Sequence, residues 1–172
     1  MEDSLQRVVE RYIRAAESFC GLIDSARAVS RSAFLSRLHV ALAELLIAGV
    51  QLPFREPDTE ELSGEAGSPS RWAQQVTSLE VKLRDTLGPN ELYWAVFDPS
   101  EKQEPVQASL ATDLAEVYWD LKEDLSLLEK HGPTGDVIWG LRESFREHWG
   151  RHGVGALGAV HHLVCLEAIE PE

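Results

Sequence analysis

The sequence predicts an all-α protein, a bundle of five or six helices that ends in a long antiparallel helix hairpin. Three observations predict it. Apolar residues recur at helical spacing in several long segments, serine or threonine precedes some of them as a helix cap, and glycine or proline ends others. A chain of 172 residues with 44% hydrophobic and 26% charged residues has the size and composition of one globular domain. Residues 1–172 are therefore predicted to form a single helical domain.

The first two helices are predicted within residues 4–24 and within a segment that ends near Val50. In residues 4–24 the apolar side chains recur every three or four positions, as on one face of an amphipathic helix. Ser30 or Ser32 caps the second helix, which is apolar on most sides and is expected at the centre of the bundle. Its carboxylate Glu44 is expected on a narrow exposed edge, with a buried functional role as the alternative.

The middle of the chain is predicted to contain a connector, one helix and a short aromatic segment. Residues 53–70 carry prolines, glycines and five acidic residues, so they are predicted to form a mobile acidic connector. A third helix then runs to Gly88 and Pro89, which end it. Residues 92–97 alternate as a strand would, but no other segment appears able to pair with them. A helical turn or an irregular plug is therefore expected there.

The C-terminal hairpin is predicted from two long apolar stripes on either side of a break at residues 131–133. The first helix is expected to begin at Pro105, and the second is capped by Thr134, with the hairpin ending at Ile169 and packing on the helix near Leu42. Four glycines interrupt the second stripe: Gly150, Gly153, Gly155 and Gly158. Each is about 1 kcal/mol less favourable in a helix than alanine, so we expect a kink or a close helix crossing there.

The net charge, the apolar runs and the cysteines limit the partners and the location that we expect for this protein. A formal net charge of −13 repels nucleic acid and anionic lipid, so neither is expected as a partner. The most apolar run, residues 38–52, is shorter than the roughly 20 residues that a membrane span needs. Cys20 and Cys165 stand alone in apolar helical segments and are interpreted as reduced core residues. With an acidic start and no leader pattern, the chain is expected in the cytoplasm.

Three carboxylates lie close together on the helix predicted after Pro105. Asp113 and Asp120 are seven residues apart, or about 20° around a helix axis, and Glu116 lies within about 60° of them. A row of carboxylates beside an apolar stripe is typical of the water-facing shoulder of a helix. In the alternative, Asp120 accepts a hydrogen bond from Tyr118 or from an arginine on a neighbouring helix.

Two histidines, His148 and His152, stand four residues apart on the apolar face of the last helix. This spacing presents two metal ligands together, and a facing carboxylate would complete a site for zinc, iron or manganese, with His148, His152 and Asp120 as the metal set. The Glu-x-x-His and His-Glu-x-x-His patterns of helical metal sites are absent. The competing interpretation is a polar core in which each buried imidazole bonds a carboxylate. The candidate polar cluster is Asp113, Glu116, Tyr118, Asp120, His148 and His152.

Other motifs carry less functional information. Residues 153–158 match Gly-x-Gly-x-x-Gly, but no strand precedes them, so they are interpreted as close helix packing and not as a nucleotide loop. Tryptophans such as Trp94 and Trp149 are expected to be core or interface anchors, and a ligand pocket is the alternative. No serine or cysteine lies in a nucleophile motif, so no catalytic residue is predicted.

Several segments resemble one bacterial protein family. They are Tyr93-Trp94-Ala95-Val96-Phe97-Asp98-Pro99, Asp113-Leu114 with Tyr118-Trp119-Asp120-Leu121-Lys122, and Phe145 followed by His148-Trp149-Gly150-Arg151-His152. They are similar to the domain of unknown function 5063, and the resemblance covers nearly the whole chain. It implies an all-helical bacterial cytoplasmic domain and adds weight to the aspartates, Tyr118 and the two histidines of the cluster, without a catalytic role for any of them.

Two functional hypotheses follow from the sequence. The first is a non-enzymatic protein-interaction or ligand-binding module, because catalytic motifs are missing and the surface is acidic and rich in tryptophan. A protein partner or a homo-oligomer fits this hypothesis, and it needs no cofactor. The second is a metal-binding, hydrolytic helical bundle that uses His148 and His152 with a carboxylate from Asp113, Glu116 or Asp120.

Overall fold

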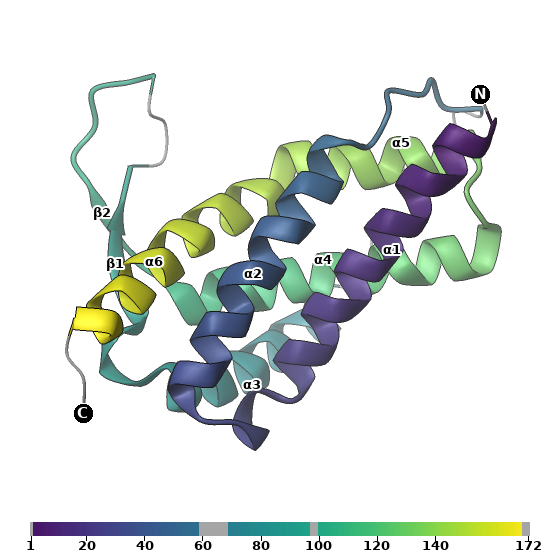
Figure 1. The fold of residues 1–172 in the computed structure, drawn as a ribbon. Helices are drawn as coiled ribbons and strands as arrows, with labels where there is room; N and C mark the ends of the chain where they lie inside the picture. The colour runs from purple at the N-terminus through teal and green to yellow at the C-terminus, as the bar shows by residue number, and fades with distance from the viewer. Residues whose placement is uncertain (1, 59–68, 97–99, 170–172) are drawn as a thin grey trace.

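The computed structural model describes residues 2–58, 69–96 and 100–169, and most of them are helical (Figure 1). The elements are α1 (Glu2–Asp24), η1 (Ala26–Ala28), α2 (Arg31–Val50), α3 (Pro69–Leu87), η3 (Gly88–Glu91), β1 (Leu92–Ala95), β2 (Val106–Ser109), α4 (Leu110–His131), α5 (Gly135–Ser144), η4 (Phe145–Trp149) and α6 (Gly150–Ile169). The all-α fold class is confirmed, and a long C-terminal helix is present. Most of the predicted connector, residues 59–68, lies outside the described residues.

Side-chain caps start three of the helices. The Ser30 hydroxyl accepts a hydrogen bond from the Ala33 amide at 3.3 Å, so of the two expected caps Ser30 is the one used. Thr134 caps α5 as predicted, by accepting from the Val137 amide at 3.3 Å. Each cap satisfies one of the amides that the first helical turn leaves without a partner.

The start of α4 and the aromatic segment both differ from the prediction. β1 pairs with β2 in an antiparallel hairpin, in the register Leu92↔Ser109 to Ala95↔Val106. The expected helical turn or plug is therefore wrong, and so is the expected helix start at Pro105. The apolar spacing of the sequence places the residues that pair with β1 in the first turn of that helix. The helix begins at Leu110 instead, where Ser109 caps it by accepting from the Thr112 amide at 3.2 Å.

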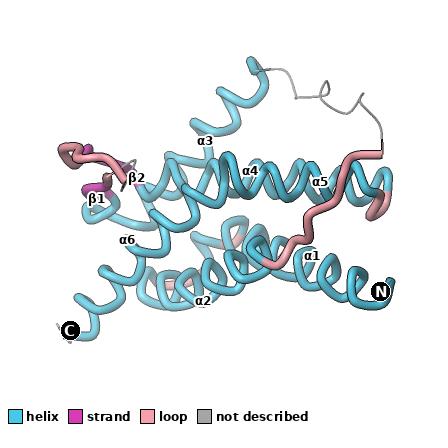
Figure 2. Tube along the Cα trace, turned by 90° about the horizontal axis from the view of Figure 1, so that it is seen from above, coloured by secondary structure: helices cyan, strands magenta, loops and turns pink. Residues whose placement is uncertain are grey.

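The helices enclose one hydrophobic core. α1 packs against α2 and α4, and α6 packs against α2 and α4. Figure 2 shows α4 and α5 on one side and α1 and α2 on the other, with α6 running obliquely between them. The largest fully buried side chains include Trp149, Tyr12, Phe19 and Phe34, which come from three different helices.

α2 is less enclosed than predicted. Leu38, Leu42 and Leu45 are fully buried, but Val40, Ile47 and Val50 on its other side are 58%, 53% and 72% exposed. Among the described residues, α2 is the one helix that is long enough and apolar enough to cross a membrane, judged by length and composition alone. Glu44 is exposed, as expected.

The burial of the cysteines and of the tryptophans follows the predictions only in part. Cys20 is buried, but Cys165 is exposed, so the interpretation of both cysteines as core residues is wrong for Cys165. Trp149 is a core anchor, whereas Trp94 on β1 is 69% exposed, which leaves for Trp94 the interface role that the sequence also allowed. Cys165 lies on a helix with one open side, where helical spacing alone does not tell which residues face solvent.

The predicted glycine-rich crossing is present where α2 meets the start of α6. A Cβ atom on Gly49 would lie 2.7 Å from the Phe145 ring and 2.8 Å from the Trp149 ring, and one on Gly153 would lie 3.2 Å from Leu46. The π-helical turn η4 immediately precedes Gly150, and α6 leaves the direction of α5 at this point (Figure 2). Both the close approach and the change of direction were expected from the glycines.

We predict that Gly49→Ala destabilises the protein. The added methyl group overlaps the Phe145 and Trp149 rings in a packed core, and overpacking of this kind costs about 1–3 kcal/mol. The measurement is the free energy of unfolding from guanidinium denaturation followed by circular dichroism. Gly158→Ala on α6 is the matched control, because nothing lies within 4 Å of its added Cβ, and it is expected to stabilise by roughly 0.5–1 kcal/mol. Equal effects of the two substitutions would contradict a close crossing.

Candidate functional site

A cleft of about 630 Å³ lies between the β1–β2 hairpin and the start of α6. Its walls are mainly apolar and include Ala95, Ala108, Phe145 and Val154. The polar side chains that line it are Tyr93, Asp113, Arg146, Arg151 and His152. A concave apolar site with a few convergent polar groups is the usual form of a ligand site.

Tyr93 enters the cleft from β1. Alternation along the strand leaves Leu92 and Trp94 exposed and turns Tyr93 toward α4 and α6. A Cβ on Gly155 would lie 2.5 Å from the Tyr93 hydroxyl oxygen, so glycine is required there for the tyrosine to reach its place. The hydroxyl donates to Asp113 Oδ2 at 2.6 Å, and burial is the main cause that raises the pKa of Tyr93.

Asp113 joins Tyr93 to His152. Its second oxygen, Oδ1, lies 2.8 Å from His152 Nδ1, so the carboxylate is held by one partner on each side. Asp113 is only 8% exposed, and the interpretation of this residue as part of a solvated shoulder is therefore wrong. The hydrogen bond to Asp113 raises the pKa of His152, against the opposing effect of burial. With Nδ1 bound to Asp113, the other ring nitrogen, Nε2, is left for a ligand.

A second pair, His148 and Asp120, lies beside the first. His148 Nδ1 is 2.6 Å from Asp120 Oδ2, and the ring centroids of His148 and His152 are 5.0 Å apart. Burial raises the pKa of Asp120, although the hydrogen bond from His148 acts in the opposite direction. The two imidazoles are neighbours, as predicted from their spacing.

The predicted burial of both imidazoles is wrong. The His148 side chain is 46% exposed and that of His152 is 21% exposed. His148 lies within the π-helical turn η4, where the wider winding changes the direction of its side chain relative to a regular helix. Trp149 is the fully buried residue of this turn.

Of the other two members of the predicted cluster, Tyr118 lies outside the site and Glu116 lies near it. Tyr118 donates to Asp24 Oδ1 at 2.9 Å and not to Asp120, so it lies outside the site. Glu116 is half-buried on α4, and its negative charge adds to the causes that raise the pKa of His152.

One residue of the cleft and one buried carboxylate of α4 were missed from the sequence. Tyr93 was not among the predicted site residues, because its strand was not predicted. Asp124 is 4% exposed and accepts from the Tyr12 hydroxyl at 2.5 Å; burial raises the pKa of both groups. Asp124 follows Asp120 by four residues, so the same helical phase that grouped the other carboxylates would have identified it.

The hydrogen bonds restrict how the cluster would hold a metal ion. The described residues contain no group of three or more histidine, cysteine, aspartate or glutamate side chains placed to hold one. Asp113 and Asp120 each bond an Nδ1 atom, so they orient the rings. The Nε2 atoms of His148 and His152 are the nitrogens left for an ion.

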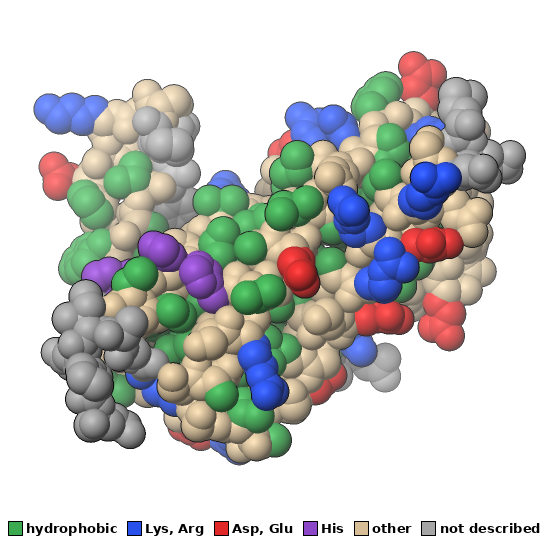
Figure 3. Space-filling view, in the orientation of Figure 1, with side chains coloured by type: hydrophobic (Ala, Val, Ile, Leu, Met, Phe, Trp, Pro, Cys, Tyr) green, Lys and Arg blue, Asp and Glu red, His purple; other side chains and the backbone are tan. Residues whose placement is uncertain are grey.

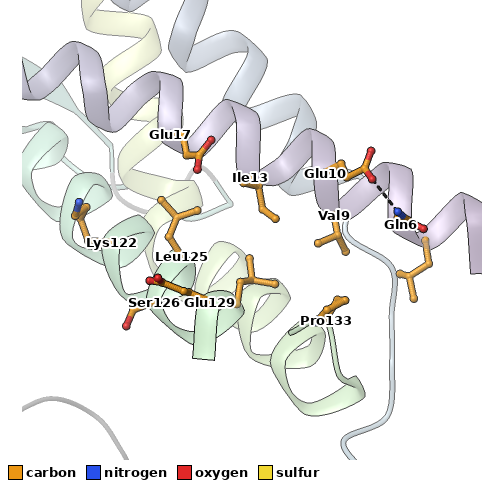
Figure 4. A pocket seen from close by; sticks show the side chains of 12 residues that line it. Gln6, Val9, Glu10, Ile13, Glu17, Lys122, Leu125, Ser126, Glu129 and Pro133 are labelled. Carbon is orange, nitrogen blue, oxygen red and sulfur yellow. Dashed lines mark hydrogen bonds between the residues drawn. The ribbon is translucent and has the colours of Figure 1, made fainter. Parts of the chain in front are cut away.

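A larger hollow of about 920 Å³ lies between α1 and α4 (Figure 4). Val9 and Ile13 from α1 and Leu125 from α4 point into it, and charged residues such as Glu10 and Glu129 stand at its edges (Figure 4). None of the predicted site residues lines it. We place the candidate site in the smaller cleft because titratable groups with shifted pKa values gather there.

Comparisons with known proteins identify a family and a similar solved structure, and they supply no activity. The sequence model of a family described as a domain of unknown function (DUF5063) matches residues 3–165. The crystal structure of protein BF1032 from Bacteroides fragilis is similar, with a TM-score of 0.72 over 91% of this chain and 91% of that chain at 20% sequence identity. No functionally curated protein in the comparison matches. The similarity to BF1032 supports the fold alone.

We predict that His152 titrates above the ordinary histidine pKa of about 6.5 and that Asp113→Asn lowers this pKa. The folded state favours the imidazolium, so its stabilising contribution is fully present below the unfolded pKa and is lost as pH rises through the higher folded pKa. The measurement is an NMR titration of the His152 ring protons. Glu116→Gln is the control and should lower the pKa by less. A His152 pKa at or below the ordinary value, or one that Asp113→Asn leaves unchanged, would contradict the geometry.

Proposed function

The chain belongs to the DUF5063 family, and we propose that it is a non-enzymatic ligand-binding module. Its ligand is a small, mainly apolar molecule with one anionic oxygen group, held in the cleft between the β1–β2 hairpin and α6. The observation that carries the proposal is an imidazole, His152, that Asp113 holds by Nδ1 at 2.8 Å in a cleft with apolar walls.

The chemistry of the ligand follows from the charge of the cleft lining. Because the pKa of His152 is raised, its imidazolium form is favoured, and in that form Nε2–H donates a hydrogen bond. Arg146 and Arg151 line the same cleft, so positive groups gather there in a protein with a net charge of −13. A carboxylate on the ligand would accept from the imidazolium, and its apolar body would contact Phe145 and Val154.

Binding is favoured over catalysis by the residues of the cleft. Tyr93, Asp113 and His152 form a hydrogen-bonded chain that orients one imidazole. The described residues that line the cleft include no serine, threonine or cysteine that this imidazole would activate as a nucleophile. These hydrogen bonds therefore serve to position the His152 imidazole as a hydrogen-bond donor for a bound molecule.

We predict that 2-naphthoate binds the cleft and that naphthalene-2-methylammonium, with the same apolar body and the opposite charge, does not. Isothermal titration calorimetry at pH 6 measures both. His152→Gln keeps a polar side chain but removes the charge, and it should weaken 2-naphthoate binding by about tenfold or more, since a hydrogen bond to a charged group contributes about 1.5–3 kcal/mol. Affinity should also fall as pH rises through the pKa of His152.

His131→Gln is the control for the calorimetry, because His131 is exposed at the end of α4, away from the cleft residues. It should bind 2-naphthoate as the unmodified protein does. Equal binding of the two naphthalene compounds, or an affinity that His152→Gln leaves intact, would contradict a site with the proposed chemistry.

The second candidate function is metal binding, with metal-assisted hydrolysis as the activity that a bound ion would allow. His148 and His152 each bond a carboxylate through Nδ1, and their ring centroids are 5.0 Å apart. Histidines that ligate metal ions generally donate their other ring N–H to such a partner. Zinc, iron or manganese bound by the two Nε2 atoms would need further ligands from water, because the described residues contain no group of three such side chains placed to hold an ion.

Under this second candidate, protein purified without a histidine tag should contain about one metal ion per chain by elemental analysis. A chelator should lower Tm, because an ion that binds only the folded state stabilises it. The double variant His148→Ala/His152→Ala should lose the ion, whereas His131→Ala should retain it. Absence of stoichiometric metal together with a Tm unchanged by chelator would remove this candidate.

The protein partner or homo-oligomer, and the cytoplasmic location, stay predictions. The surfaces that would support an association are the hollow between α1 and α4 and the exposed side of α2 with Val40, Ile47 and Val50. Both expose apolar side chains that a partner of complementary shape would cover.

A further inference from the structure

A second group of metal-ligating side chains lies on the surface where α2 and α6 pack together, and none of them belongs to the cleft. His39 from α2 and His161 from α6 have ring centroids 5.2 Å apart, with His39 Nε2 3.3 Å from His161 Nδ1. Cys165, one helical turn after His161, places Sγ 3.6 Å from the other nitrogen of that ring, Nε2. Figure 3 shows histidine side chains gathered on this face of the molecule.

We propose that His39 and His161 form a two-ligand site for a divalent late transition metal ion of the zinc, copper or nickel class. Two imidazole nitrogens that each lie about 2.0–2.1 Å from a tetrahedral ion are about 3.3 Å apart. The observed separation of His39 Nε2 and His161 Nδ1 is 3.3 Å, so an ion would replace the shared proton without a shift of either helix. Imidazole ligands favour these ions over magnesium and calcium.

Cys165 is a positioning residue of this site and not a ligand. When His161 Nδ1 binds the ion, Nε2 carries the ring proton and donates it to Cys165 Sγ at 3.6 Å. Outer-shell partners of this kind fix the tautomer and the orientation of a ligating histidine. Because the described residues contain no group of three such ligands, water completes the coordination of the ion.

The consequence of metal binding is a link between the two helices whose crossing organises the core. His161 and Cys165 are exposed and His39 is half-buried, so an ion reaches the site from solvent. An ion that bridges α2 and α6 binds the folded chain and not the unfolded chain, in which the two histidines lie far apart in sequence. Zinc therefore raises the Tm of the protein in a concentration-dependent way.

The test is the change in Tm on titration with zinc chloride, using full-length protein without a histidine tag and stripped of metal by a chelator. Tm should rise with zinc concentration in the unmodified protein, in His162→Ala and in the double variant His148→Gln/His152→Gln. The rise should be lost in His39→Ala and in His161→Ala. His162 is the matched control because it is also an exposed histidine on α6, adjacent to His161. Circular dichroism checks that each variant is folded before zinc is added.

The outcomes separate this site from the cluster at the cleft. A rise in Tm that survives both His39→Ala and His161→Ala, or that is lost equally in His162→Ala, would overturn the proposal. A rise lost only when His148 and His152 are replaced would also overturn it, and would support the metal candidate at the cleft instead. Absence of any rise in the unmodified protein overturns it directly.

The role of Cys165 is tested separately with cobalt. Cys165→Ala, which removes the acceptor, should weaken zinc binding by about tenfold, the usual effect of losing an outer-shell partner. The visible spectrum of the Co²⁺-loaded protein should lack a strong thiolate charge-transfer band, because Sγ does not contact the ion. Such a band, lost in Cys165→Ala, would overturn the positioning role and make Cys165 a direct ligand.

Discussion

The close approach of α2 to the π-helical turn before α6 is the contact on which the rest of the structure depends. Gly49 has no side chain where the Phe145 and Trp149 rings pack, so the two helices meet with a tryptophan fully buried between them. From this point α6 runs away from the direction of α5. The same crossing therefore carries His152 to Asp113 on one side and brings His161 beside His39 on the other.

The carboxylates of α4 connect this crossing to the rest of the molecule. Asp113, Asp120 and Asp124 follow one side of the helix, and each is bonded by a residue of another element: Tyr93 of β1 and His152 of α6 at Asp113, His148 of η4 at Asp120, and Tyr12 of α1 at Asp124. A buried carboxylate without such a partner is strongly destabilising, so these bonds specify how the neighbouring elements are placed around α4. The same bonds orient the imidazoles that face solvent or the cleft.

Part of the candidate site could be predicted because it depends on helical phase. The spacing of four residues placed His148 and His152 together, and the spacing of seven placed Asp113 and Asp120 on one side of the facing helix. The pairing of the histidines with the aspartates could therefore be predicted from helical phase. The exposure of His148 could not be predicted in this way, because the π-helical turn η4 departs from the regular helical phase. Tyr93 could not be predicted as a site residue because its strand has only four residues and pairs with a second strand that begins eleven positions later, at Val106.

The sequence by itself determined the helical class, the cap at Thr134, the glycine-dependent crossing and the grouping of two histidines opposite the carboxylates of α4. These follow from local spacing, backbone geometry and the chemistry of each side chain, which act over a few residues. Only the tertiary structure decided which carboxylate bonds which histidine, that a hairpin closes one wall of the cleft, and that His39 meets His161 and Cys165. Those contacts join residues tens of positions apart. Their distances depend on how whole helices cross, and the periodicity of a sequence does not predict the geometry of a crossing.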